Sequence, residues 1–114
     1  MGNYQVKTKH GYDFFEVSSA FQKAIRRGDE HMALTWGVEL WMSGYKNYVW
    51  KRMSIIVSED IGLAQPEAPA VFWSLYQKYQ YWVAQPKETG KLEYYHAISY
   101  LTRCRKSRYI DLLI

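Results

Sequence analysis

The heptapeptide Ser58-Glu59-Asp60-Ile61-Gly62-Leu63-Ala64 lies near the middle of the chain, and the architecture can be worked out from it in both directions. Upstream, apolar residues recur at spacings of three and four, which predicts a helix over residues 47–61. Gly62 is expected to stop this helix, because glycine readily adopts conformations that a helix cannot contain. The residues that we expect to face the core are Val49, Met53, Ile56 and Val57.

Two adjacent carboxylates, Glu59 and Asp60, fall at the C-terminal end of that helix, where negative charge opposes the helix dipole. A compensating cation is therefore expected, and Arg26, Arg27 or Arg52 can supply it. A catalytic acid pair or a metal site is the alternative, but neighbouring helical residues point about 100° apart, which suits neither. We interpret four residues as a structural signature: Ser58, Glu59, Asp60 and Gly62.

The rest of the chain predicts further helices joined by short loops. Gly28 is expected as a left-handed cap after one helix, and Asp29 as the side-chain cap of the next. Pro66 and Pro69 both suit the opening turn of a later helix. The predicted fold class is all-α, with five to six helices in a compact bundle; the helices expected besides 47–61 are 14–26, 29–43, 66–84, 92–103 and a short turn over 109–114.

Composition limits the class of protein. At 114 residues, with 48% hydrophobic and 23% charged residues, the chain predicts one globular domain over 11–114 after a polar tail over 1–10. The sequence contains neither an apolar run of membrane-spanning length nor a signal-peptide core, so no membrane partner is expected. A single cysteine, Cys104, excludes an intrachain disulfide and favours a cytoplasmic location.

Motifs for catalysis are missing from the sequence. The three histidines, His10, His31 and His96, lie far apart and lack the spacing of a metal-binding helix pair. Cys104 stands between two arginines, which can make a thiol reactive, but no base is evident beside it. No glycine-rich phosphate-binding loop occurs. We therefore expect no enzyme activity, no cofactor and no metal.

Aromatic residues make up 18% of the chain, more than a small core requires. Trp and Tyr combine a large apolar surface with a polar group and are enriched at protein interfaces. Surplus aromatic side chains therefore favour self-association, and closed homo-oligomers are the commonest outcome. We expect a dimer or tetramer with these interface residues: Trp36, Trp41, Trp50, Tyr81 and Trp82.

Basic residues form two clusters in a chain of net charge +4. Beside Tyr100 and Tyr109, the C-terminal cluster combines cations for phosphates with aromatic rings for stacking, which is typical of single-strand binding. The alternative is a solvated surface that also complements the negative end of helix 92–103. The candidate residues for DNA contact are Lys23, Arg26, Arg27, Arg103, Arg105, Lys106 and Arg108.

Several segments in order along the chain, from Gly11-Tyr12-Asp13 through the heptapeptide 58–64 to Lys106-Ser107, resemble a known family. They are similar to the domain that follows the ATPase module in the RarA/MgsA family, relatives of clamp loaders and of the Werner helicase-interacting protein. The likeness covers roughly residues 11–110. The loop over 44–47 is shorter than usual, and Cys104-Arg105 replaces a small apolar pair. The segments that carry the resemblance are Gly11-Tyr12-Asp13, 18–26, Gly28-Asp29, 33–36, Lys51-Arg52, the signature, Pro66, 97–101 and Lys106-Ser107.

The resemblance implies a helical module that assembles an ATPase into a tetramer at stalled replication forks. We expect the chain to act without a motor of its own, which is also compatible with a phage or other mobile-element origin. The predicted function is a non-catalytic, self-assembling module linked to DNA replication, repair and recombination, which co-assembles with a RarA-type ATPase and modulates it. The alternative is a small DNA-binding protein that uses the C-terminal basic cluster.

Overall fold

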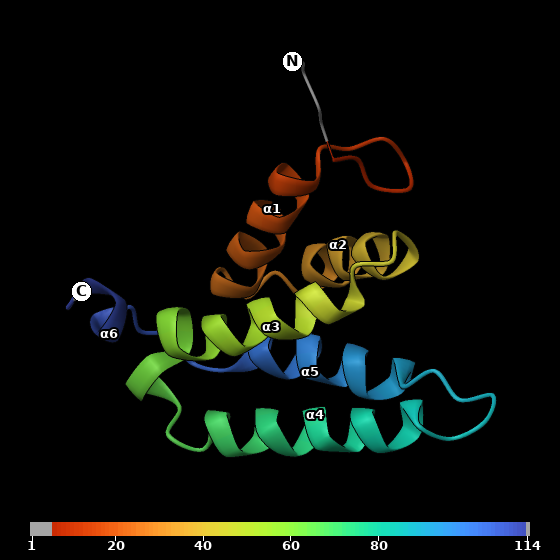
Figure 1. Ribbon diagram of the computed structural model, residues 1–114. Helices are drawn as coiled ribbons and strands as arrows, with labels where there is room; N and C mark the ends of the chain where they lie inside the picture. The colour runs from red at the N-terminus through yellow and green to blue at the C-terminus, as the bar shows by residue number, and fades with distance from the viewer. Residues whose placement is uncertain (1–5, 114) are drawn as a thin grey trace.

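The computed structural model describes residues 6–113 and is all-α over that range, as the sequence predicts. Figure 1 shows α1 and α2 on one side of the molecule, α4 on the opposite side, and α3 and α5 between them. The helices are α1 (Phe14–Arg26), α2 (Glu30–Met42), α3 (Lys46–Ile56), α4 (Ala68–Val83), α5 (Lys91–Arg103) and α6 (Tyr109–Leu112).

The predicted caps between α1 and α2 are confirmed. Gly28 is left-handed, with φ of 72°, and a Cβ at this position would lie 3.4 Å from the carbonyl oxygen of Thr102. The side chain of Asp29 accepts a hydrogen bond from the backbone N–H of Met32 at the start of α2. Asp13 caps α1 in the same way, through Glu16. These short-range signals fix the boundaries of the first two helices.

Two predicted helix boundaries are wrong. The helix expected over 47–61 ends as α-helix at Ile56 and continues as a π-helical turn, η1 (Val57–Ile61), and a 3₁₀ turn, η2 (Gly62–Ala64). The wider π turn changes the direction in which residues 57–61 point relative to a regular helix. The helix expected from Pro66 begins at Ala68, and Pro69 lies in its first turn as predicted.

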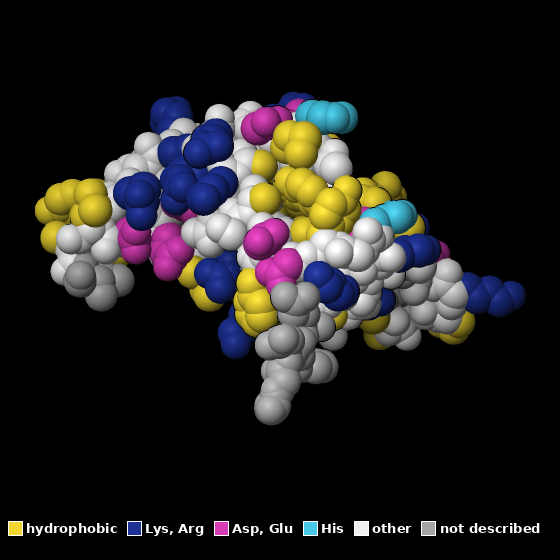
Figure 2. All heavy atoms as spheres, turned by 90° about the horizontal axis from the view of Figure 1, so that it is seen from above, with side chains coloured by type: hydrophobic (Ala, Val, Ile, Leu, Met, Phe, Trp, Pro, Cys, Tyr) yellow, Lys and Arg dark blue, Asp and Glu magenta, His cyan; other side chains and the backbone are white. Residues whose placement is uncertain are grey.

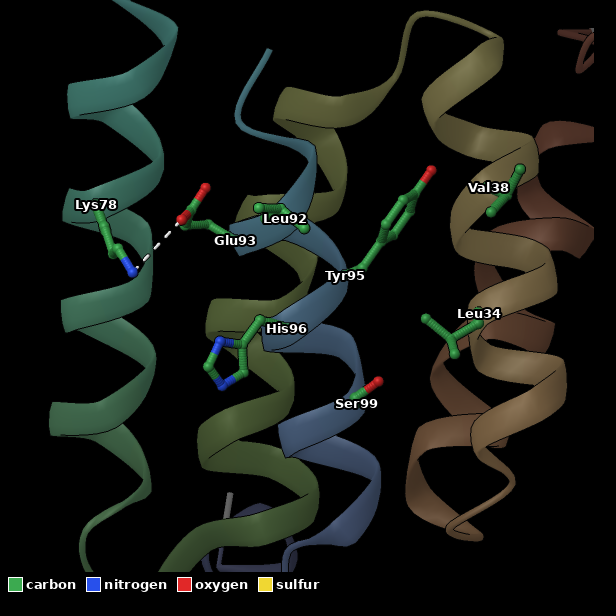
Figure 3. A pocket seen from close by; sticks show the side chains of 8 residues that line it. All are labelled: Leu34, Val38, Lys78, Leu92, Glu93, Tyr95, His96 and Ser99. Atoms are coloured by element: carbon green, nitrogen blue, oxygen red, sulfur yellow. Dashed lines mark ion pairs between the residues drawn. The ribbon is translucent and has the colours of Figure 1, made fainter. Parts of the chain in front are cut away.

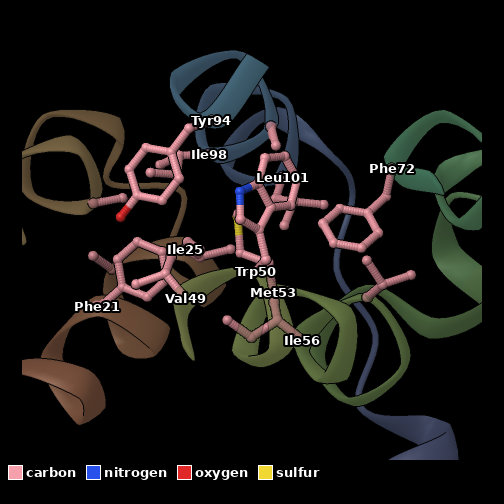
Figure 4. Packing of buried hydrophobic residues seen from close by; sticks show 14 of the residues in the cluster. Phe21, Ile25, Val49, Trp50, Met53, Ile56, Phe72, Tyr94, Ile98 and Leu101 are labelled. Carbon is pink, nitrogen blue, oxygen red and sulfur yellow. The ribbon is translucent and has the colours of Figure 1, made fainter. Parts of the chain in front are cut away.

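The core lies between α1, α3 and α5, with α4 packed mainly against α5 (Figures 1 and 4). Tyr94 on α5 is fully buried, and its hydroxyl donates a 2.7 Å hydrogen bond to the carbonyl of Gly37 on α2. A Cβ on Gly37 would lie 2.6 Å from Ile98 Cδ1, so a side chain at position 37 would force Ile98 to shift where α2 and α5 pack together. Other fully buried core residues are Phe21, Ile25, Val49, Met53, Ile56 and Leu101.

Residues 6–10, expected as part of a polar tail, are folded back onto α2. The backbone N–H of His10 donates to Glu39 Oε2 at 2.8 Å, and the backbone N–H of Lys9 donates to Ser43 Oγ at 2.7 Å. Burial alone raises the pKa of Glu39, but hydrogen bonds from the His10 backbone and ring outweigh it and hold that pKa below its usual value. The rest of the predicted tail, residues 1–5, lies outside the described range.

None of the helices within residues 6–113 is both long enough and apolar enough to cross a membrane.

Candidate interaction surfaces

The signature carboxylate Asp60 lies at the centre of a polar network. It is 1% exposed, and its side chain accepts a 2.9 Å hydrogen bond from Gln22 on α1. Arg26 Nη1 and Arg108 Nε lie 3.8 and 3.9 Å from Asp60 Oδ1. A buried carboxylate needs such partners, because an unpaired charge in the interior is strongly unfavourable. Asp60 therefore joins α1, η1 and the C-terminal segment.

The other signature residues lie around this network. Glu59 accepts a 2.9 Å hydrogen bond from the same Gln22 amide, while Ser58 is exposed. Gly62 has φ of 53° and ψ of −129°, and a Cβ there would lie 3.1 Å from the carbonyl oxygen of Ser107. In addition, the Ser107 N–H donates a 2.8 Å hydrogen bond to the Asp60 carbonyl. This arrangement holds the segment before α6 against η1.

Arg26 is the compensating cation that the sequence predicted, whereas Arg108 is a second partner that it did not. Sequence reasoning placed Arg108 in a cluster for phosphate contact. Its guanidinium instead lies between Asp60 and Asp111, and Nη2 donates to Asp111 Oδ2 at 2.8 Å. No local pattern indicates a contact between residues 60 and 108, because it depends on how the C-terminal segment crosses η1.

The other basic residues of the C-terminal cluster also have partners within the chain. Arg103 forms a bidentate ion pair with Glu30: Nη2 donates to Oε1 at 3.0 Å, and Nε donates to Oε2 at 3.1 Å. These hydrogen bonds lower the pKa of Glu30. Arg105 Nε donates to the Ala64 carbonyl at 3.0 Å. Lys106 Nζ donates to the Thr102 carbonyl at 2.8 Å, at the C-terminal end of α5. These contacts favour the capping alternative for this cluster.

The two basic clusters, distant in sequence, come together in space. Arg26 and Arg108 share Asp60, and the turn at Gly28 lies against Thr102 at the end of α5. Figure 2 shows Lys and Arg side chains gathered in one area of the face seen from above, with Asp and Glu side chains beside them. Lys23 and Arg27 are exposed at the same end of α1. The structure thus forms one mixed-charge surface with a basic excess.

Trp50, predicted as an interface residue, is instead part of the core. It is 3% exposed and lies among Phe72, Tyr79 and Tyr94, with ring centroids 5.7, 4.8 and 6.1 Å away (Figure 4). Its large side chain fills the space between α3, α4 and α5 that smaller residues would leave empty. The prediction for Trp50 is therefore wrong.

The other four predicted aromatic residues keep some accessible surface. Trp36 is half-buried, with Tyr12 edge-on to its ring at 5.3 Å. Trp41 is also half-buried and packs on Tyr94 at 4.7 Å. On α4, Tyr81 is 59% exposed, and the adjacent Trp82 is also exposed. Of these four residues, the two on α4 are therefore more accessible than the two on α2.

Trp73 on α4 is 55% exposed and was missed by the sequence reasoning. Its immediate neighbour Phe72 is buried, so a helical stripe drawn through Phe72 leaves Trp73 outside the core. A sequence signal was present: residues 68–86 contain a single charged residue, Lys78. A helix with only one charge has an uncharged solvent-facing side, and Trp73 lies on it.

A shallow apolar groove lies on the surface where α2 and α5 meet (Figure 3). Its volume is about 620 Å³, and Leu34 and Val38 on α2 face Tyr95 on α5 across it. Lys78 and Glu93 form a 3.7 Å ion pair at the edge. His96 also lines the groove, and within residues 6–113 no cluster of three His, Cys, Asp or Glu residues could hold a metal ion. The groove is suited to apolar contact.

Cys104 is buried, and burial raises the pKa of its thiol. A raised pKa disfavours the thiolate, which is the reactive form of cysteine. The arginines on either side in sequence therefore do not activate it: Arg103 is paired with Glu30, and Arg105 donates to the Ala64 carbonyl.

The fold and the signature define the class of protein. The family model described as the C-terminal part of the MgsA AAA+ ATPase matches residues 28–111. The chain belongs to this family, and the resemblance stated from the sequence is confirmed. The domain is thus the kind found at the C-terminal end of an AAA+ ATPase.

Two relatives share the sequence of this domain, and the name of the first refers to replication-associated recombination. Replication-associated recombination protein A of Bacillus subtilis (strain 168) is 42% identical over 60 residues, covering 53% of this chain and 14% of that protein. ATPase WRNIP1 of Dictyostelium discoideum is 31% identical over 117 residues, covering 97% of this chain and 13% of that protein. The chain thus spans 13–14% of the length of these relatives.

Proposed function

We propose that this domain is a non-catalytic, self-assembling module that acts with AAA+ ATPases of its own family in DNA replication, repair or recombination. The observation that carries the proposal is the large aromatic and apolar surface left uncovered on a small domain. Trp73 and Tyr81, both on α4, are each more than half exposed. Exposed apolar patches of this kind mark interaction sites.

Co-assembly with an ATPase follows from shared structure. Domains of one family share a fold, so a relative whose corresponding helix carries a similar uncharged aromatic face could pair with this chain through that face. Such a pairing would place this domain beside the motor of the relative and change how many motors meet in one assembly. Modulation of the ATPase would then need no catalytic residue in this chain.

Self-assembly is tested by light scattering on the purified chain, and co-assembly by mixing it with a full-length RarA-type ATPase. We expect a mass above one chain of 13.6 kDa, and a mixed species that contains both proteins. The ATPase rate of the mixture is measured against that of the ATPase alone. A monomeric chain contradicts self-assembly, and an ATPase whose mass and rate are both unchanged contradicts co-assembly.

A second candidate function, DNA binding, is favoured by one observation: the two basic clusters meet on one surface. Phosphate binding weakens steeply with salt, because each contact releases counterions. Lys23 and Arg27 are the residues to change, since Arg26 and Arg108 also hold Asp60. The double change Lys23→Ala with Arg27→Ala should lower the salt dependence of single-stranded DNA binding by roughly two counterions. An unchanged slope, or no binding at low salt, contradicts this function.

A further inference from the structure

We infer that the outer face of α4 is a self-association surface, on which a second copy of this chain docks with its own α4 antiparallel. The inference rests on the proposed function and names the surface that performs it. The face is defined by residues at helical spacing along the side of α4 that points away from the bundle: Ala70, Trp73, Gln77, Gln80, Tyr81 and Ala84.

The first observation that supports self-association through α4 is the scarcity of charged residues on this helix. Between Glu67 and Lys87 the sequence contains one charged residue, Lys78, although charged residues make up 23% of the chain. Lys78 lies outside the face as defined, because it pairs with Glu93 on α5 at 3.7 Å. Depletion of charge together with enrichment in Trp and Tyr distinguishes the centre of an interface from ordinary surface.

The second observation is the position of α4 in the bundle. It lies at the edge of the molecule in Figure 1, packed mainly against α5 on one side, so its opposite side is open along its length. All six residues of the face are exposed. Trp73 packs on Tyr76 with ring centroids 5.7 Å apart, and Gln80 donates a 3.0 Å hydrogen bond to the Tyr76 hydroxyl. These contacts hold the aromatic rings along one ridge.

A recess lies directly beside this ridge. It is a groove of about 430 Å³ between α3 and α4, lined on its apolar side by Ile55, Phe72 and Tyr76 and bordered by Lys51. A ridge and a recess on the same face are complementary to each other when two copies meet about a two-fold axis. With the helices antiparallel and centred on Gln77, Trp73 of each copy lies against Tyr81 of the partner subunit.

The overall charge favours a second copy as the occupant. Each chain carries a net charge of +4, so two copies repel each other across most of their surfaces. The neutral face of α4 is where that repulsion is smallest, whereas a nucleic acid would be drawn to the basic surface around α1 instead. Gln and Tyr side chains on the face can also exchange hydrogen bonds with their own kind, since each carries both donor and acceptor.

The experiment compares the solution mass of three proteins by light scattering over a range of concentrations: the natural chain, Trp73→Glu and Leu92→Glu. Trp73→Glu places a charge on each copy within the proposed interface, about one helical turn from its centre. Leu92→Glu is the matched control, because it makes the same chemical change at an exposed apolar residue of the α2–α5 groove. We expect Trp73→Glu to halve the mass and Leu92→Glu to leave it unchanged.

Thermal unfolding followed by circular dichroism shows whether the variants fold. Should Trp73→Glu fail to fold, Gln77→Lys replaces it, since Gln77 is exposed and a lysine there repels its symmetry mate. In addition, Gln77→Cys should give a disulfide-linked dimer, because an antiparallel two-fold pairing brings residue 77 of both copies together. The native Cys104 is buried and serves as the background control.

The outcomes separate the inference from the proposed function. If Leu92→Glu dissociates the assembly and Trp73→Glu does not, self-assembly stands but occurs through the groove, and the inference about α4 is wrong. If both variants keep the natural mass and Gln77→Cys does not cross-link, the inference is also wrong. A natural chain that stays monomeric at every concentration overturns both.

Discussion

The end of the molecule around Asp60 is rich in charged side chains, whereas the outer face of α4 has none. Around Asp60, several charged side chains from α1, η1 and the C-terminal segment meet, and they neutralise one another within the chain. Along the outer face of α4 there is no charged side chain, and the aromatic rings have no cover. In the sequence, the charged residues around Asp60 suggest a functional site, but in the structure they stabilise the fold. The outer face of α4 suggests only an ordinary helix in the sequence, but in the structure it is the surface accessible to a partner.

Contacts within the chain determine whether a charged motif or an uncharged helix face is available to a partner. Adjacent carboxylates and several arginines in a sequence suggest catalysis or DNA binding. In this chain, however, Asp60 pairs with Arg26 and Arg108, so little of their charge remains for a partner. A helix face without charge has no such internal use, because its residues contribute nothing to the core. The contrast can be tested by substitutions in each region, since the first should lower stability and the second should change assembly.

The largest effect on stability is expected from Asp60→Ala. It removes the acceptor of the Gln22 hydrogen bond and leaves Arg26 and Arg108 without their shared carboxylate. We expect a loss of about 3 kcal/mol in the free energy of unfolding, measured with urea. Glu59→Ala is the matched control, because that side chain is half-buried and shares only the Gln22 amide. Equal losses in the two variants would show that Asp60 is not the centre of the network.

Gly62→Ala is expected to cost about 2 kcal/mol. The new Cβ would lie 3.1 Å from the Ser107 carbonyl oxygen, at a φ of 53° that side chains rarely adopt. Gly44→Ala separates the steric contact from the backbone strain. Gly44 also has a positive φ, 86°, but no atom lies within 4 Å of the added Cβ. Gly62→Ala should therefore be the more destabilising of the two in thermal unfolding. The reverse order would mean that the C-terminal segment does not pack on Gly62 as described.

Glu39→Gln tests a second buried carboxylate, the one that holds residues 6–10 against α2 through His10. We expect a loss of about 1–2 kcal/mol at pH 7, because the bonds from His10 lose their charged acceptor. The folded-state pKa of Glu39 is lowered from 4.5, so its contribution is complete above that value and is lost as pH falls through the folded pKa. As pH falls from 4.5 through the folded pKa, the natural chain and Glu39→Gln should converge in stability. A gap that stays constant down to pH 3 would contradict this role.

The smallest effect on stability is expected from Gln80→Lys on the outer face of α4. Gln80 is exposed, so in a dilute, monomeric sample we expect a change within about 0.5 kcal/mol. The same substitution should weaken self-association, because each copy then carries a new positive charge at the pairing surface. Stability is read from urea unfolding, and assembly from the concentration dependence of the mass. A large loss of stability with no change in assembly would assign Gln80 to the fold rather than to a partner.

Much of the fold could be predicted because its signals are local. Asp13 and Asp29 cap the helices that follow them, and Gly28 adopts the conformation that side chains avoid, so boundaries near these residues are readable in sequence. The order of the helices follows from apolar spacing for the same reason. The π turn at Val57–Ile61 could not be predicted, since it depends on how Asp60 and Ile61 pack against α1 and α6.

The candidate surfaces were harder to predict, because they depend on contacts between distant segments. Trp50 and Trp73 are both tryptophans on amphipathic helices, yet one fills the space between three helices and the other faces solvent. Apolar spacing alone does not decide which side of α4 meets the core when residues 72, 73, 75 and 76 are all apolar. The sequence likewise predicted that Arg108 contacts phosphate. In the structure, the path of the C-terminal segment places Arg108 beside Asp60 instead.

The most direct test of this account is the solution mass of the natural chain, measured by light scattering at low and at high salt. Assembly through a neutral aromatic face predicts a mass of two or more times 13.6 kDa that does not fall when the salt concentration is raised. Burial of apolar surface is not screened by salt, whereas ion pairs are. A mass of one chain throughout, or an assembly that falls apart at high salt, would contradict the account.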